Sequence, residues 1–153
     1  MSEWTFGQKA LVVLAALQLL WATAGFIAEP SFHIGADAPT EKVLGVDFNG
    51  YHALSGFLLF LPAFYFARRP DWALYYTLYV VVALYATGVW AFFTEQPAWV
   101  FTFPDNANDA IFHLATGTAF AVLAAIQWTE NQRQSPNLRS STSEVSDRRL
   151  ANR

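Results

Sequence analysis

Four long apolar stretches that contain no Asp, Glu, Lys or Arg restrict the fold of this chain more than any other feature. They cover residues 10–28, 49–67, 72–94 and 110–128 of the 153-residue sequence. Each stretch has about the ~20 residues that a helix needs to cross the hydrocarbon core of a bilayer. A backbone in lipid must satisfy its own hydrogen bonds, and no alternating pattern indicates a barrel. The sequence therefore predicts an all-α integral membrane protein, an antiparallel four-helix bundle over residues 1–128.

The composition supports a membrane protein and excludes several classes of function. Charged residues make up 14% of the chain and apolar residues 54%, whereas a soluble domain usually carries about 25% charged residues. The chain has no cysteine, which excludes disulfides, thiol catalysis and cysteine-ligated zinc or iron–sulfur sites. A net charge of −3 gives no general surface for nucleic acid, so the expected main partner is the lipid bilayer.

Local signals predict how the stretches are connected. The segment 68–71, Arg-Arg-Pro-Asp, predicts a tight turn that makes the second and third stretches antiparallel neighbours. Asn49 is expected to be the N-cap of the second helix and Asp109 the N-cap of the fourth. Pro62 lies inside the second stretch, where it should kink the helix and free the carbonyl of Leu58.

The distribution of basic residues predicts the orientation in the membrane. Lys9, Arg68, Arg69 and five arginines after residue 128 fall on one side, and only Lys42 falls on the other, together with seven acids. Loops rich in Lys and Arg stay in the cytoplasm. We therefore expect a multi-pass protein of the cell inner (cytoplasmic) membrane with both termini cytoplasmic. Residues 129–153 have no aromatic side chain, which predicts a disordered cytoplasmic tail.

The two halves of the chain share a pattern that predicts two helical-hairpin repeats. His52 is followed four residues later by Gly56, and His113 is followed four residues later by Gly117. The two histidines are 61 residues apart along the chain, and so are the two glycines. An axis along the membrane normal would relate such parallel repeats. The motif Ala22-Thr23-Ala24 also resembles a signal-peptidase site, but its counterpart in the repeat favours a retained first span.

The repeat places the polar residues of the spans at one depth. His52 and His113 each lie about one turn inside a helix that begins at the outer face. Asn49 and Asp109 precede them by three and four residues and share their faces. The glycines lie one turn deeper, where they allow a helix or a flat ligand to approach closely.

Two motifs carry a resemblance to a known family. The second stretch opens with Asn49-x-x-His52-x-x-x-Gly56, and the fourth opens with Asn106-x-x-Asp109-x-x-x-His113-Leu114-x-x-Gly117. With these motifs and the four spans, residues 7–127 resemble the small bacterial four-helix membrane proteins known as domain of unknown function 4383. Ala53 stands where the family pattern has Leu. The resemblance implies the fold and the topology, and it implies no established activity.

Three functions remain open for the polar residues. In the first, the protein has a non-enzymatic structural or accessory role. His52 would then bond a backbone carbonyl or Asn106, and His113 would bond Asp109 or Asn49 across the helices. The candidate binding residues are Asn49, His52, Gly56, Asn106, Asp109, His113 and Gly117.

The second function is a redox protein that binds a divalent metal or haem through His52 and His113. Asp109, Asp47 or Glu29 would supply an oxygen ligand to a metal, and His33 is a candidate third histidine. For haem, the two histidines would be axial ligands and the two glycines of the repeat would make room for the ring.

The third function is a lipid or quinone binder whose amphipathic pocket is lined by aromatic residues. The candidates are Tyr51, Trp90, Trp99, Phe101 and Phe103. The spans contain no deep acid or base, and no nucleophile has an evident base and orienting acid beside it. We therefore expect no enzyme. Small residues such as Ala115 and Ala119 make faces that can also pack against other membrane proteins.

Overall fold

The computed structural model describes residues 3–33, 38–93 and 107–151, with side chains as far as residue 133. It contains α1 (Phe6–Ala28), β1 (Glu41–Val43), β2 (Val46–Phe48), α2 (Gly50–Phe60), α3 (Ala63–Phe66), α4 (Pro70–Trp90) and α5 (Ala107–Ala151). Helix α1 packs against α2, α4 and α5, and α4 packs along α5. The expected helical fold is confirmed. Within the described residues, three helices are long and apolar enough to span a membrane, and Gly50–Phe66 is a shorter apolar helical segment.

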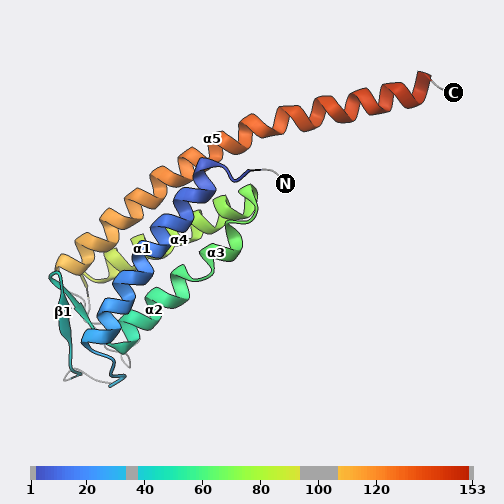
Figure 1. Ribbon diagram of the computed structural model, residues 1–153. Helices are drawn as coiled ribbons and strands as arrows, with labels where there is room; N and C mark the ends of the chain where they lie inside the picture. The colour runs from blue at the N-terminus through green and yellow to red at the C-terminus, as the bar shows by residue number, and fades with distance from the viewer. Residues whose placement is uncertain (1–2, 34–37, 94–106, 152–153) are drawn as a thin grey trace.

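The helices lie side by side, and the polar segments gather at the two ends of the body (Figure 1). The start of α1, the turn between α3 and α4 and the point where α5 leaves the body lie at one end. The β-hairpin lies at the other end, where α2 also begins. The antiparallel arrangement of α2–α3 and α4 therefore follows the tight turn that the sequence predicts at residues 68–71.

The second apolar stretch is broken at Pro62. Helix α2 ends at Phe60, and the four-residue helix α3 begins at Ala63. Proline has no N–H to donate, so the helix cannot continue its ladder through this position. The hydroxyl of Tyr76 on α4 donates to the carbonyl of Leu59. The sequence predicts that Pro62 frees the carbonyl of Leu58. The bond from Tyr76 goes to the carbonyl of the next residue, Leu59.

A small antiparallel hairpin lies in the segment between α1 and α2. Strands β1 and β2 pair Lys42 with Asp47 and Val43 with Val46. Leu44 and Gly45 between them both have positive φ, 52° and 87°. Two such residues make the tight turn that matches the twist of paired strands. The segment lacks the Asn-Gly or Asp-Gly dipeptide that usually signals this turn, so the turn is not predicted from the sequence.

Buried side-chain amides form hydrogen bonds between the helices at the end opposite the hairpin. Thr5 and Gln8 form a capping box, so α1 begins at Phe6. The Nε2 group of Gln8 also donates to the carbonyl of Ala67 at 2.7 Å. Gln127 on α5 donates to the carbonyl of Gly7 at 3.1 Å. The start of α1 is thereby fixed to both the end of α3 and the middle of α5.

Helix α5 continues to Ala151, through the segment for which the sequence predicts a disordered tail. Its contacts with the body reach beyond residue 128. Glu130 accepts a bond from the Gly7 N–H at 3.0 Å, and Asn131 donates to the Pro70 carbonyl at 3.2 Å. Once a helix is nucleated, each further residue adds one backbone bond at small cost. The helix therefore extends past the body (Figure 1).

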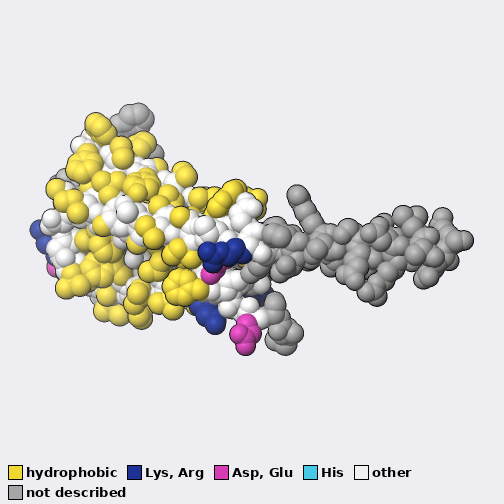
Figure 2. Space-filling model, turned by 90° about the horizontal axis from the view of Figure 1, so that it is seen from above, with side chains coloured by type: hydrophobic (Ala, Val, Ile, Leu, Met, Phe, Trp, Pro, Cys, Tyr) yellow, Lys and Arg dark blue, Asp and Glu magenta, His cyan; other side chains and the backbone are white. Residues whose placement is uncertain are grey.

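The interior of the body is built mainly from small and aliphatic side chains, while many large apolar side chains point outward. Figure 2 shows hydrophobic side chains over most of the visible face of the body, with charged groups toward its ends. Leu20, Ile27, Tyr75 and Val82 are all more than 60% exposed. The buried cluster comprises Leu11, Ala15, Phe60, Ala63, Ala67, Ala73, Tyr76, Val80, Leu84, Phe120 and Leu123.

We predict that Tyr76→Phe lowers the free energy of unfolding by about 1–2 kcal/mol, because it leaves the Leu59 carbonyl without its donor in apolar surroundings. The measurement is denaturant unfolding in detergent micelles, which the apolar surface requires. Tyr75→Phe is the matched control, since Tyr75 lies one residue earlier and is 69% exposed. Equal stability of the two variants would show that the bond at the helix break contributes nothing.

Candidate functional site

Three side chains from two helices converge near the hairpin end of the bundle. His52 comes from α2, and Asp109 and His113 come from α5. Asp109 lies 3.7 Å from Nε2 of His52 through Oδ1 and 3.4 Å from Nε2 of His113 through Oδ2. One ligand atom of each residue lies within 4.8 Å of the other two. The two histidines do face a shared centre, and the carboxylate of Asp109 lies there with them.

Local structure at the start of α2 fixes the ring of His52. Asn49 is the N-cap, as predicted, and its side chain accepts a bond from the His52 N–H at 2.9 Å. The Nδ1 of His52 lies 2.9 Å from the carbonyl oxygen of Asp47. Phe48 stacks on the ring with centroids 4.4 Å apart and an angle of 14°. The carbonyl of Asp47 and the ring of Phe48 therefore fix the imidazole independently of any group from α5.

Asp109 is not the N-cap of the fourth helix, and this corrects the prediction from sequence. Helix α5 begins at Ala107, so Asp109 lies in its first turn and is completely buried. The positive end of the helix dipole favours a negative charge at this position. His113 follows one turn later on the same face, as the spacing predicted, and its ring centroid is 5.9 Å from that of His52.

The two glycines of the predicted site contact neighbouring helices. A Cβ at Gly56 would lie 2.9 Å from the Cβ of Ala22 on α1. A Cβ at Gly117 would lie 3.4 Å from the Cβ of Leu84 on α4. For both glycines the geometry shows close packing against a neighbouring helix, which is one of the two roles that the sequence leaves open, and Gly56 also lines a cavity beside His52.

Two other glycines support the site directly. A Cβ at Gly25 would lie 2.0 Å from the ring of Phe48, the residue that stacks on His52. A Cβ at Gly88 would lie 3.1 Å from the Cβ of His113. Gly25 follows the segment Ala22-Thr23-Ala24, and Gly88 follows the similar segment Ala86-Thr87. This shared placement is a sequence signal for the two glycines.

Among the described residues, the group that could hold a metal comprises His52, Asp109 and His113 and includes none of the other candidate ligands. His33 is exposed in the segment after α1. Glu29 accepts a bond from the Ser31 N–H at 3.0 Å. Asp47 meets His52 through its backbone carbonyl. Asn106 lies outside the described residues.

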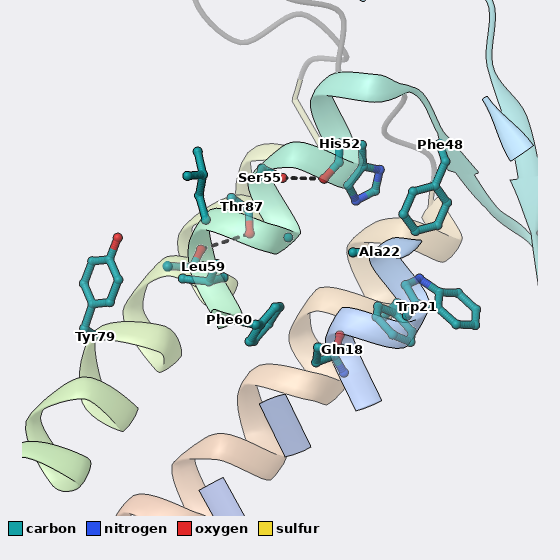
Figure 3. A pocket seen from close by; sticks show the side chains of 14 residues that line it. Gln18, Trp21, Ala22, Phe48, His52, Ser55, Leu59, Phe60, Tyr79 and Thr87 are labelled. Carbon is teal, nitrogen blue, oxygen red and sulfur yellow. Dashed lines mark hydrogen bonds between the residues drawn. The ribbon is translucent and has the colours of Figure 1, made fainter. Parts of the chain in front are cut away.

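A cavity of about 310 Å³ lies beside His52 among α1, α2, α4 and α5 (Figure 3). Its polar side chains include Gln18, Ser55 and Thr87. The hydroxyl of Ser55 donates to the carbonyl of His52 at 2.7 Å, and that of Thr87 donates to the carbonyl of Ala83 at 2.9 Å. Both hydroxyls are therefore engaged by their own helices, which leaves the cavity wall largely apolar.

The predicted aromatic pocket is not assembled by the residues that the structure describes. Tyr51 packs against Phe32 with ring centroids 5.1 Å apart. Trp90 lines a separate apolar groove along α4 together with Phe93. Trp99, Phe101 and Phe103 lie outside the described residues. Other aromatic residues line the cavity instead, among them Trp21, which stacks on Phe112 at 5.2 Å.

The family described as Domain of unknown function (DUF4383) matches residues 8–126. The chain belongs to this family. The match covers both histidine motifs, Asn49 to Gly56 and Asn106 to Gly117, and it confirms the resemblance found in the sequence. Comparisons with curated proteins and with solved structures find no match. The function of this member of the family must therefore be argued from its residues.

We predict that Gly25→Ala lowers the free energy of unfolding by about 1–3 kcal/mol, because the new methyl group displaces Phe48 from its place on His52. Gly117→Ala is the matched control, since its Cβ would meet only ordinary contacts of 3.4–3.7 Å. There alanine should be neutral or stabilise the helix by about 0.5–1 kcal/mol. Thermal unfolding of both variants in detergent measures the difference, and equal effects would contradict the assigned role of Gly25.

Proposed function

We propose that this chain is a small multi-pass protein of the cytoplasmic membrane with a non-enzymatic, structural or accessory role. The His52–Asp109–His113 cluster joins its two halves near the outer face of the membrane. The observation that carries the proposal is the outward-facing apolar surface of helices long enough to cross a bilayer.

The lengths of the helices fit the hydrocarbon core. Helix α1 has 23 residues and α4 has 21, and at 1.5 Å per residue they extend about 30–35 Å. The apolar part of α5, Ala107–Arg133, has 27 residues. The shorter pair α2–α3, Gly50–Phe66, runs between the same two ends of the body. Hydrophobic side chains that point outward from these helices would face lipid (Figure 2).

The charges at the two ends support the predicted orientation. Lys9, Arg68 and Arg69 belong to the end from which α5 leaves the body (Figure 1). The guanidinium of Arg68 lies 5.3 Å from the ring of Tyr65, and that of Arg69 lies 4.7 Å from the ring of Trp72. Arginine and aromatic residues together are typical of a membrane–water interface. We assign this end to the cytoplasm and the β-hairpin end to the outer face.

The cluster supports a structural role because it joins the two halves of the chain through buried polar groups. His52 belongs to the first half, and Asp109 and His113 belong to the second. Polar contacts between helices fix their register in lipid, where the hydrophobic effect gives them no reason to associate. The hydroxyls of Ser55 and Thr87, which line the neighbouring cavity, donate to backbone carbonyls. This arrangement supports a binding or packing role over nucleophilic catalysis.

The absence of cysteine from the chain allows a direct test of topology with single introduced thiols. We predict that Thr40→Cys, before the hairpin, reacts with a membrane-impermeant maleimide in right-side-out vesicles. Gln132→Cys, near the point where α5 leaves the body, should react only after the vesicles are opened. The cysteine-free parent is the labelling control, and the protein should stay in the pellet after alkaline carbonate extraction. Equal labelling of both variants in sealed vesicles, or release by carbonate, would contradict the proposal.

We predict that His52→Leu combined with His113→Leu lowers the free energy of unfolding by about 1–4 kcal/mol. Each polar contact between helices contributes about 0.6–2 kcal/mol in membranes, and the double variant removes both imidazoles from Asp109. The measurement is unfolding in detergent with EDTA present, and His33→Leu is the control at an exposed histidine. An unchanged melting temperature of the double variant would exclude the structural role.

A further inference from the structure

We propose that Nε2 of His52, a carboxylate oxygen of Asp109 and Nε2 of His113 bind one divalent transition-metal ion of the Zn²⁺ class. This inference deepens the proposed function and rests on it, because it assigns a ligand to the cluster that joins the two halves.

The separations within the cluster suit metal ligands better than hydrogen bonds. The carboxylate oxygens of Asp109 lie 3.4 Å and 3.7 Å from the two Nε2 atoms. A hydrogen bond between a ring nitrogen and a carboxylate oxygen spans about 2.7–3.2 Å. Two ligands about 2.0 Å from a tetrahedral Zn²⁺ lie about 3.3 Å apart. The two distances involve different oxygens of Asp109, and one ligand atom from each residue lies within 4.8 Å of the other two. A cation among them would therefore draw the three side chains closer together.

The hydrogen bond of His52 prepares its other nitrogen to bind a metal. A carbonyl oxygen can only accept, so the Nδ1 of His52 must donate its proton to Asp47 across 2.9 Å. In the neutral ring, Nε2 then presents a lone pair toward the carboxylate of Asp109. Two electron-rich atoms repel each other unless a proton or a metal cation lies between them, and a metal cation can serve both histidines at once. Histidine ligands of metals commonly donate their other N–H to a backbone carbonyl in this way.

The backbone and the rings around the cluster preorganise the three ligands. Asn49 fixes the start of α2 directly before His52, and Phe48 covers one face of its ring. Asp109 and His113 are spaced by one turn of the same helix. Asp109 is completely buried, and a divalent cation beside it would compensate the cost of removing its charge from water.

The donor set selects the class of ion. Two imidazoles and one carboxylate suit zinc and neighbouring first-row metals, whereas Ca²⁺ and Mg²⁺ prefer oxygen ligands alone. Three protein ligands leave a coordination position for water or a small anion. Haem fits this geometry poorly, because the carboxylate of Asp109 lies beside both Nε2 atoms.

The test uses the full chain purified in mild detergent, stripped with EDTA and then freed of the chelator. Zn²⁺ is titrated against a chelating dye, and bound zinc is measured by elemental analysis after gel filtration. We expect one zinc ion per chain and a higher melting temperature that EDTA reverses. Both results come from the unaltered protein, so they do not depend on whether a variant folds.

The variants His52→Gln, Asp109→Asn and His113→Gln identify the ligands. Each should weaken zinc binding by more than about tenfold, since loss of even a supporting group around a metal costs 10–100-fold. His33→Gln, at an exposed histidine outside the cluster, should bind zinc like the parent. Co²⁺ loaded in place of zinc should give visible absorption typical of four-coordination, and azide should change it at the open position.

The outcomes separate the metal site from the structural role. Folded protein that retains no zinc, or variants that bind zinc as tightly as the parent, would overturn the inference. If the double histidine variant is then still destabilised in EDTA, the cluster holds the helices through direct contacts and the proposed function stands. Failure of the membrane-labelling experiment would remove the proposed function whatever the zinc result.

Discussion

The arrangement of the helices at the hairpin end depends on the burial of one carboxylate. A charge removed from water is costly unless polar or charged groups surround it. Asp109 lies in the first turn of α5, where the helix dipole favours its charge, and it faces two imidazoles from different halves of the chain. This meeting requires that α2 and α5 begin at the same level of the bundle. The hairpin and the Asn49 cap set where α2 begins, which explains why so much local structure precedes His52.

The opposite end of the bundle is held by a different set of polar contacts, and the middle by small side chains. Gln8 and Gln127 bond backbone carbonyls of other segments, while Ala15, Ala63 and Ala73 are completely or almost completely buried. In lipid, apolar side chains gain little by leaving one apolar neighbour for another, so close contact between backbones and buried polar bonds must hold helices together. Polar contacts at both ends with a closely packed middle are what this constraint favours.

The sequence was most informative where one residue decides the local structure. Asn49 caps α2 because its side chain reaches the His52 N–H, and Pro62 stops the same helix because it lacks an N–H. Helical spacing alone placed Asp109 and His113 on one face. Sequence reasoning was less successful where the partner is distant along the chain. The hydroxyl of Tyr76 meets Leu59, and Phe48 packs on Gly25, yet nothing in the local sequence names either partner. The same limit explains why the sequence predicts Asp109 as a cap. A cap at Asp109 would start the helix at residue 110, and α5 starts three residues earlier, at Ala107.

The two histidines of the cluster lie in similar settings, and the polar residues that precede them differ in chemistry and in spacing. Each half carries a histidine near the start of a helix, with a glycine of the preceding helix close to the histidine or to its neighbour Phe48. The first half places an amide, Asn49, before its histidine and uses it as a cap. The second half places a carboxylate, Asp109, and directs it at both rings. Two carboxylates at this depth would add a second buried negative charge, and two amides would leave no charge to attract a cation. With one amide and one carboxylate, the cluster contains two imidazoles and a single carboxylate. These groups can either contact one another directly or hold one divalent ion. The difference between the halves is therefore as important to the site as their similarity.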